Sequence, residues 1–497
     1  MNRQIRQLAL GLMLCYVVLF GALNYWQIGQ EQELSGRFDN TRQVLREFNK
    51  PRGQIITADG VVIARSLPNT TDDELDFVRD YPAGDLLSNV TGYFTKDFGS
   101  TQIENAFGDV LTGSTTAQQV RGLGDLLVGN IDNTGSVHLT LRHDAQLAAK
   151  FFLGANEGSV TVIEPATGRV VAMYSNPTYD PNDFVGADFE EARDTITKLQ
   201  TADGNPLLAN AYQERYMPGA TFKVVTTGIG LETGTITPET EFPREREFVP
   251  PQTDDPIQNY NGSQCGGKLP EVFRRSCNIP FAKTALELGP DLFVSGTERW
   301  GIGETVPIDL PNAASSTIGN TDNLDQELPL LAIRGFGQSE DQMVPLHMAM
   351  VAATVANNGQ MMQPYVVDAT YDNSGRLLDQ TQPQVWKTPI SPITANTIRE
   401  FMIGVVESGT ASCCLDLQGG IQAAAKTGTA ELGVADNPDL SHAWIVAFAP
   451  AEAPRYTVSV VLRNVQSTQD VAATGGRLAG PIAQGVLDFL LTGQGAG

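Results

Sequence analysis

The sequence predicts an α+β protein that begins with a membrane anchor, and two observations lead to this class. The chain has 497 residues, of which 41% are hydrophobic and 18% charged, values typical of globular domains. Strand-like and helix-like segments are mixed without a strict alternation of strand, helix and strand. This mixing favours an α+β fold over a parallel α/β sheet.

The run Leu8–Trp26 predicts a single transmembrane helix. It contains no charged residue and is long enough to span a bilayer. Arg3 and Arg6 precede it, so the positive-inside tendency places the N-terminus in the cytoplasm and the remaining chain outside. A cleaved signal peptide is the alternative, but the run is too long and no small-x-small site follows it. We expect residues 1–29 to form a cytoplasmic tip and an anchor in the cell membrane.

Residues 30–140 carry the signals of a separate N-terminal domain. The stretch 52–66, "RGQIITADGVVIARS", alternates around Asp59-Gly60, a dipeptide that tight hairpin turns prefer, and predicts two paired strands. The stretch 100–113, "STQIENAFGDVLTG", predicts a helix that ends at Gly113.

The remainder, residues 141–497, contains apolar strands and well-delimited helices. An extended piece followed by a helix is predicted within 138–154, and a buried hairpin within 159–177. Pro345 suits the first turn of a helix that Gly359 ends. Two further strands are predicted at 442–450 and 455–463, and a closing helix at 479–491.

Composition excludes two classes of partner. A formal net charge of −24 argues against nucleic acid, because phosphate binding needs clustered Lys and Arg. The four histidines are scattered without metal-ligand spacing, so we expect no metal site and no cofactor. The four cysteines beyond the predicted anchor could form two disulfides by any of three pairings, and the sequence does not choose among them; they are Cys265, Cys277, Cys413 and Cys414.

Three short stretches carry the possible chemistry. They are Ala220-Thr221-Phe222-Lys223 after a Pro-Gly turn, Ser276-Cys277-Asn278, and Lys426-Thr427-Gly428-Thr429. Each alone fits an ordinary explanation: a helix start, a loop serine, and a strand with an exposed lysine. Cys277 fits a buried residue or half of a disulfide, with Cys265 for example, better than a redox switch. The order and the spacing of the three stretches therefore carry the argument.

A helix-borne lysine, then Ser-x-Asn on a loop, then Lys-Thr-Gly on a strand resembles the layout of penicillin-recognising acyl-transferases. The likeness covers most of the chain. The segments "RGQIITADGVVIA", "VIEPATGRVVAMYSNPTYDPNDF", "YMPGATFKVVTTGIGLETG", "RRSCNIPFAKTALELG", "GFGQSEDQMVPLHMAMVAATVANNGQMMQPYVV" and "HAWIVAFAP" resemble, in order, class B penicillin-binding proteins, in particular the actinobacterial elongation and division enzymes of PbpA and FtsI type.

This resemblance implies a fold and a division into domains. The transpeptidase domain of the family is an antiparallel sheet covered by helices, and it would occupy residues 141–497. Residues 30–140 would form an elongated pedestal, or dimerisation-type, domain between that fold and the anchor.

The resemblance also implies a reaction. In this family a serine attacks the penultimate D-Ala carbonyl of a peptidoglycan stem peptide, and an amine from a neighbouring strand resolves the acyl-enzyme into a cross-link. β-Lactams acylate the same serine. Carried over to this chain, Lys223 would deprotonate the nucleophile, Ser276 would relay a proton to the leaving group, and Asn278 would orient Lys223 and the substrate amide.

The strand stretch would hold the substrate. Lys426, with Thr427, Gly428 and Thr429, would bind the substrate carboxylate, which suits the positive charge and the hydroxyls there. The backbone N–H groups of residues 220 and 429 would form the oxyanion hole.

The nucleophile itself is missing. The family reads Pro-Gly-Ser-Thr-Phe-Lys where this chain has Ala220 in the place of the serine, and Met217 stands where proline is usual. Backbone donors survive a change from serine to alanine, so we expect the carboxylate site and the oxyanion hole to persist without covalent chemistry. Thr221 is rotated about 100° from residue 220 on a helix and points away from Lys223. Ser276 is the better-placed spare hydroxyl.

Two classes of function stay open. The chain is either a D,D-transpeptidase whose serine has been replaced, or a pseudoenzyme that binds stem peptide and holds or activates a SEDS-family glycosyltransferase in the membrane. The other intact motif residues favour the first, and Met217 favours the second. A β-lactamase is disfavoured by the anchor and the large N-terminal domain, and a β-lactam sensor by the few residues before the anchor. In both open classes β-lactams would bind non-covalently at most.

Overall fold

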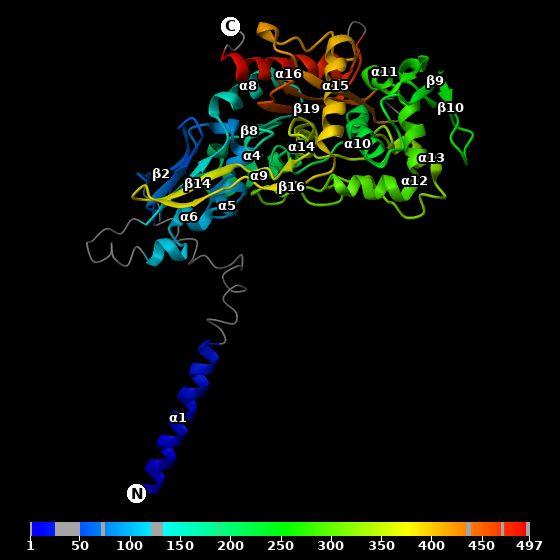
Figure 1. The fold of residues 1–497 in the computed structure, drawn as a ribbon. Helices are drawn as coiled ribbons and strands as arrows, with labels where there is room; N and C mark the ends of the chain where they lie inside the picture. Colours follow the sequence, from blue (N-terminus) through cyan, green and yellow to red (C-terminus); the bar gives the residue numbers. More distant parts are fainter. Residues whose placement is uncertain are drawn as a thin grey trace.

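The computed structural model of the chain describes residues 2–24, 50–70, 75–120, 133–186, 188–433, 439–468 and 472–493 (Figure 1). The first element is helix α1 (Asn2–Asn24), along which large apolar side chains are exposed. Within these ranges we find no helix with both the length and the apolar character that crossing a bilayer requires. The expected span Leu8–Trp26 extends past the described part of α1 and stays a prediction.

A five-stranded antiparallel sheet lies at the centre of the larger part of the body, in the order β17-β18-β19-β7-β8. Almost all residues of these strands are buried, because helices cover both faces of the sheet. The hairpin expected within 159–177 is confirmed by the pairing of β7 with β8, and the strands expected at 442–450 and 455–463 are confirmed as β18 and β19. The bounds are β7 Gly158–Ile163, β8 Val170–Asn176, β17 Ala424–Glu431, β18 Ser441–Ala449 and β19 Tyr456–Val465.

Helices form a layer on each face of this sheet (Figure 1). Helices α8 (His143–Leu153) and α16 (Gly475–Thr492) pack together on one face, and α16 begins four residues before the closing helix we expected. On the other face lies α14 (Pro345–Ala356), which is buried along its whole length and begins at the expected proline. Beside α14, α15 (Pro392–Ser408) packs on β17, and α10 (Lys223–Thr233) and α11 (Leu269–Arg274) pack against α15. Farther from the sheet, α12 (Ile279–Arg299) packs against α10, and α13 (Leu328–Arg334) packs against α12.

The smaller part of the body is built on a six-stranded sheet in the order β15-β14-β6-β1-β2-β3. The antiparallel pairing of β1 with β2 confirms the hairpin expected around Asp59-Gly60. Strand β6 runs parallel to β1 and antiparallel to β14, so two strands from beyond residue 140 complete the sheet. The bounds are β1 Ile55–Ile56, β2 Val62–Pro68, β3 Phe77–Asp80, β6 Gly135–Leu139, β14 Val367–Asp372 and β15 Leu377–Gln380.

Short elements complete the described ranges. Helix α9 (Phe189–Thr201) begins at Asp188, whose side chain accepts a hydrogen bond from the backbone N–H of Glu191. The two-stranded pairs are β4 (Phe94–Thr95) with β5 (Gly99–Ser100), β9 (Glu241–Glu245) with β12 (Cys265–Lys268), β10 (Glu247–Phe248) with β11 (Ile257–Gln258), and β13 (Met361–Met362) with β16 (Val385–Lys387).

The single helix expected over 100–113 is wrong. The structure has two short helices there, α5 (Gln102–Ala106) and α6 (Gly108–Thr112), and Gly113 ends the second in a left-handed conformation. A continuous helix would need the carbonyl of Glu104 to accept from the backbone N–H four residues later. The Arg52 guanidinium donates to that carbonyl instead, and the helix breaks at Phe107.

A buried ion network fixes this part of the body. The Glu104 carboxylate, which is fully buried, accepts from Arg52 Nε at 2.6 Å and from Arg79 Nε at 2.7 Å, and Tyr81 Oη donates to it at 3.2 Å. Burial would raise the pKa of the Glu104 carboxyl, but Arg79 and Arg52 outweigh it and hold that pKa below its usual value. The stability that the network contributes is therefore lost as the pH falls through the lowered pKa.

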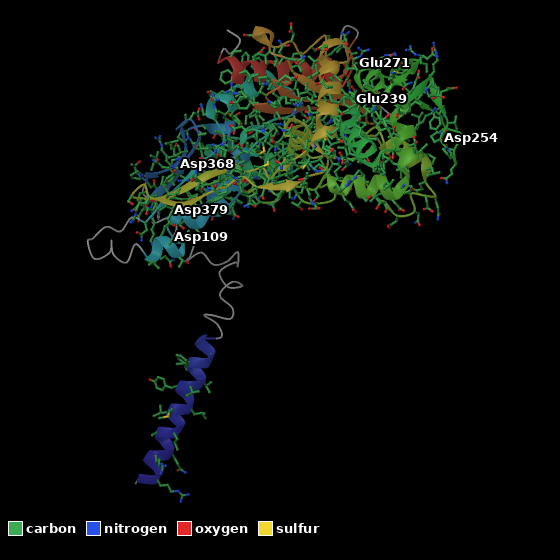
Figure 2. The ribbon with its side chains drawn as sticks, in the orientation of Figure 1. Asp109, Glu239, Asp254, Glu271, Asp368 and Asp379 are labelled. Atoms are coloured by element: carbon green, nitrogen blue, oxygen red, sulfur yellow. A yellow bond between two sulfur atoms is a disulfide. The ribbon has the colours of Figure 1, made fainter. Side chains whose placement is uncertain are left out.

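Acidic side chains lie at both ends of the described body. Figure 2 shows Asp109, Asp368 and Asp379 around the six-stranded sheet, and Glu239, Asp254 and Glu271 at the opposite end of the body.

We predict that Glu104→Gln lowers the free energy of unfolding by about 3–5 kcal/mol, because two buried guanidinium groups lose their shared carboxylate. Asp80→Asn is the matched control. It breaks the partly exposed pair that Asp80 forms with Arg65 on the same sheet, and we expect a loss of no more than about 1 kcal/mol. Urea unfolding measures both variants, and equal losses would contradict the assignment of stability to the buried network.

Candidate active site

Lys223 is the first residue of α10 and follows a short 3₁₀ turn, Gly219–Phe222. Gly219 has φ 53°, and a Cβ atom built on it would lie 2.5 Å from the carbonyl oxygen of Thr429 on β17. Only glycine therefore lets this turn lie directly against the strand. The turn is also held from β18, because the indole N–H of Trp444 donates to the carbonyl of Met217 at 2.9 Å.

Ser276 and Asn278 lie between α11 and α12 and face Lys223. The Lys223 Nζ atom is 2.8 Å from Asn278 Oδ1, 2.9 Å from the carbonyl oxygen of Ser276 and 3.4 Å from Ser276 Oγ. Ser276 has φ 58°, a left-handed conformation that is uncommon for a residue with a side chain. This conformation turns both its carbonyl and its hydroxyl toward the lysine.

Lys426 reaches the same serine from β17. Its Nζ atom is 2.8 Å from Ser276 Oγ and 2.8 Å from the carbonyl oxygen of Thr427. One hydroxyl thus lies between two lysine amines that belong to different elements. Lys426 and Lys223 are both fully buried, so the simpler interpretation of Lys426 as an exposed lysine on a strand is wrong.

The two lysines have lowered pKa values. Burial, and then the charge of Lys426, hold the pKa of Lys223 well below its usual value. Burial alone lowers the pKa of Lys426 to about 7. The lowered pKa favours the neutral amine of Lys223, which suits a proton acceptor, while Lys426 retains a partial positive charge near pH 7.

Among the described residues of the site, no hydroxyl takes the place that Ala220 leaves. The Thr221 hydroxyl is buried and donates to the carbonyl of Pro218 at 2.8 Å, so it is turned away from Lys223 as we expected. The Ser276 hydroxyl is already bonded to both lysines. The described site contains the groups that would activate a nucleophile at position 220, but residue 220 has no atom to activate.

Further residues that the sequence reasoning missed support the strand. The hydroxyls of Thr410 and Thr427 are hydrogen-bonded to each other, and the Gln338 side chain donates to the carbonyl of Thr429 at 3.2 Å. The Thr429 hydroxyl accepts from the backbone N–H of Gly475 at 3.2 Å. Gln338 belongs to the "GFGQ" stretch that carries the family resemblance, whereas Thr410 has no signal of its own.

Disulfides take up the four cysteines beyond α1. Cys265 pairs with Cys277, with Cα atoms 5.8 Å apart, and Cys413 pairs with its neighbour Cys414 in the turn after α15. The first bond ties the residue between the site serine and asparagine to β12. Cys277 is thus half of a disulfide, as one of the two ordinary explanations had it.

The described ranges contain no group of three or more His, Cys, Asp or Glu residues that could hold a metal ion. His347 is buried and bonds to the Ser316 hydroxyl and the Trp300 carbonyl, and burial lowers its pKa to about 4. It is a structural histidine of the core.

Two family models match the chain. The model of the penicillin binding protein transpeptidase domain matches residues 158–488, and that of the penicillin binding protein A dimerisation domain matches residues 52–137. Together they cover both parts of the body.

Curated relatives and solved structures agree with these models. The peptidoglycan D,D-transpeptidase PbpA of Mycolicibacterium smegmatis is 33% identical over 497 residues, with 98% of each chain covered, and PbpA of Mycobacterium tuberculosis is 32% identical over 99% of this chain and 100% of its own. The ceftriaxone acyl-enzyme complex of penicillin-binding protein A from M. tuberculosis superposes with a TM-score of 0.82 at 31% identity, over 90% of this chain and all of that one. A D,D-transpeptidase domain from Eggerthella lenta gives a TM-score of 0.76 at 31% identity, over 90% of this chain and 99% of that one.

The lowered pKa of Lys426 predicts a pH-dependent carboxylate site. Below about pH 7 the ammonium form can pair with a carboxylate, and above it the charge is lost, so affinity for N-acetyl-D-alanyl-D-alanine should fall as the pH rises from 6 to 9. Loss of one charge-assisted hydrogen bond, about 1.5 kcal/mol, corresponds to roughly a tenfold weaker Kd. Isothermal titration calorimetry measures it. Lys426→Met should abolish the pH dependence. The control Lys268→Met, at an exposed lysine on β12, should retain it. An affinity that does not change with pH in the unmodified chain would contradict the role of Lys426 in binding the carboxylate.

Proposed function

The chain belongs to the class B penicillin-binding protein transpeptidases, and we propose that it recognises D-Ala-D-Ala ends of peptidoglycan stem peptides in a site that cannot form an acyl-enzyme. As a member of this peptidoglycan D,D-transpeptidase family it takes part in cell-wall synthesis. The observation that carries the proposal is the hydrogen-bonded set of Lys223, Ser276, Asn278 and Lys426 around Ala220.

Each residue of the set has a role that its surroundings support. Lys223, whose lowered pKa favours the neutral amine, is the base that would take a proton from a nucleophile at position 220. Ser276, bonded to both lysine amines, is the group that would pass this proton to the leaving nitrogen. Asn278 holds Lys223 through its Oδ1 atom.

The strand would receive the carboxylate end of the ligand. Lys426 supplies the positive charge, and Thr427 and Thr429 supply hydroxyls beside it on β17; Gly428 between them lets the turn before α10 approach, because a Cβ atom there would lie 2.7 Å from the carbonyl oxygen of Pro218. The backbone N–H groups of residues 220 and 429 are the oxyanion donors of this proposal, and neither depends on a side chain.

Alanine at position 220 removes the covalent step alone. Without a hydroxyl there is no atom to form the ester with a stem peptide or a β-lactam, while recognition by the strand and by backbone donors remains. Removing the nucleophile of an acyl-transfer enzyme costs on the order of 10⁶ in turnover. β-Lactams, which acylate the penicillin-binding protein A of M. tuberculosis in its solved complexes, would bind this chain non-covalently.

We further propose that residues 8–26 anchor the protein in the cell membrane, with the N-terminus in the cytoplasm and residues 141–497 outside as the transpeptidase domain. The uncharged run and the two arginines before it support this placement. Residues 30–140 would then be the pedestal between them, extended by the β14–β15 hairpin in the same sheet.

A second candidate function follows from Ala220. A protein that cannot acylate could serve as a scaffold, holding or activating a SEDS-family glycosyltransferase through the anchor and the pedestal. This candidate predicts that the membrane-extracted full-length chain co-purifies with such a partner, and that deleting residues 1–29 weakens the association. Association of undiminished strength after the deletion would contradict it.

We predict that fluorescent penicillin does not label the chain and does label the Ala220→Ser variant. Position 220 lies one helical turn before Lys223, so a serine there would find its base already in place. A denaturing gel reports labelling, and Ala220→Ser combined with Lys223→Met is the control that should remain dark.

Labelling of the unmodified chain would contradict the proposal, and Ser276→Ala would then test whether Ser276 carries the label. If neither the chain nor Ala220→Ser is labelled while both are folded, the scaffold function becomes the better account.

A further inference from the structure

The residue at the N-cap of helix α12 does not cap the helix, because its side chain binds Lys223 instead. Asn278 is the N-cap of this helix, but its side chain makes no capping hydrogen bond, because Oδ1 accepts from Lys223 Nζ at 2.8 Å. The first backbone N–H groups of a helix have no partner within the helix and need one from outside. An asparagine is among the residues that ordinarily supply it from the N-cap position.

Asn259 supplies the missing partner from another part of the chain. Its Oδ1 atom accepts from the backbone N–H of Asn278 at 2.8 Å and from that of Ile279 at 3.2 Å. The next residue, Pro280, has no N–H, and the one after it bonds to the carbonyl of Asn278. The start of α12 is thereby fully satisfied.

The nitrogen of the Asn259 carboxamide is also fully hydrogen-bonded. Asn259 Nδ2 donates to the carbonyl oxygens of Glu245 at 3.0 Å and Ser263 at 3.2 Å, and the residue is only 3% exposed. All its partners are backbone groups: N–H groups on the oxygen side and carbonyls on the nitrogen side. The orientation of the amide is therefore dictated by its partners.

The neighbour of Asn259 orients the Asn278 side chain. The carbonyl oxygen of Gln258 accepts from Asn278 Nδ2 at 3.1 Å, which leaves Oδ1 as the atom that faces Lys223. Because a carbonyl oxygen can only accept, the contact with Gln258 requires the amide nitrogen on that side and allows a single orientation. Residues 258–259 thus hold both the main chain and the amide of Asn278.

We propose that Asn259 is a positioning residue for the acyl-transfer site, acting through Asn278 on Lys223; this rests on the proposed function of that site. It caps α12 in place of Asn278 and so releases the Asn278 side chain to bind the lysine. The disulfide of Cys277 holds the preceding residue but contacts neither the Asn278 N–H nor its amide.

The surroundings of Lys223 define what a charge at position 259 would do. From β17 the lysine faces Lys426, and from α12 and the segment after α13 it faces the rings of Phe281 and Phe336, at 5.3 and 5.9 Å from the ring centroids. In the described ranges no carboxylate is hydrogen-bonded or ion-paired to it. A carboxylate at position 259 would therefore be the opposite charge that raises the pKa of Lys223.

The first arm of the test needs no ligand. Hydrogen exchange of the full chain, read by mass spectrometry over residues 276–283, compares Asn259→Ala, Asn259→Asp and the control Asp188→Ala, which removes the N-cap of α9 at a comparable cost of about 1 kcal/mol. We expect the fastest exchange in Asn259→Ala and a smaller change in Asn259→Asp, since aspartate keeps both accepting contacts but loses the two donated to the carbonyls of Glu245 and Ser263. Unchanged exchange in Asn259→Ala would overturn the proposal.

The second arm measures positioning in the Ala220→Ser background. The rate of β-lactam acylation should fall roughly 10- to 100-fold in Asn259→Ala, since a misplaced base is costly. Asn259→Asp should recover only part of the rate, because it keeps the accepting contacts and loses the donated ones. Its ionised carboxylate should move the acidic limb of the pH profile upward by about half a pH unit, because a base with a raised pKa becomes neutral only at higher pH. Asp188→Ala should leave the rate and the profile unchanged.

The outcomes separate this proposal from the function on which it rests. If Ala220→Ser is not acylated, the proposed function fails, and the exchange experiment still decides whether Asn259 caps α12. If Ala220→Ser is acylated and both Asn259 variants match it in rate and in profile, the positioning role is overturned alone. Asn259→Asp also guards against a failure of Asn259→Ala to fold.

Discussion

Two lysine side chains are buried against one serine hydroxyl, and the rest of the site depends on how their charges are arranged. Lys223 and Lys426 are fully buried, and two ammonium groups that share Ser276 cannot both stay charged without a large cost. Burial and the charge of Lys426 hold the pKa of Lys223 well below its usual value, which favours its neutral form and relieves this conflict. A neutral amine beside a partly charged one is the combination that a base and a carboxylate site require.

The scaffold meets this constraint by close contacts between backbones. Gly219 and Gly428 let the turn before α10 lie on β17, which brings Lys223 to the strand that carries Lys426. The left-handed conformation of Ser276 and the disulfide of Cys277 then present the serine between the two amines. Backbone packing and conformation thus bring the two lysines and the serine together, and none of these contacts involves the side chain of residue 220.

Much of the framework could be predicted from the chain because its signals are local. The apolar runs of β7, β8, β18 and β19 predict a buried sheet, and Pro345 marks the start of α14. The break in 100–113 could not be predicted, because the Arg52 guanidinium that takes the Glu104 carbonyl comes from a segment 52 residues away. The β14–β15 hairpin in the first sheet is likewise a pairing between distant segments.

The candidate site divides in the same way. The types and the order of the site residues could be predicted from the sequence. The roles of these residues came from a family resemblance rather than from their spacing. The contacts between these residues could not be predicted from the sequence. The position of the serine between two lysines, the capping of α12 by Asn259, and the pairing of Cys413 with Cys414 all depend on the folded arrangement. Contacts of this kind join residues that have no periodic relation in the chain.

The central claim is that recognition remains in a site that has lost its nucleophile. A crystal structure of the unmodified chain soaked with penicillin G tests it most directly. We predict an intact β-lactam ring, with its carboxylate against Lys426, Thr427 and Thr429 and no bond to the protein. An opened ring esterified to Ser276, or a site that stays empty while the Ala220→Ser crystal is acylated, would contradict the account.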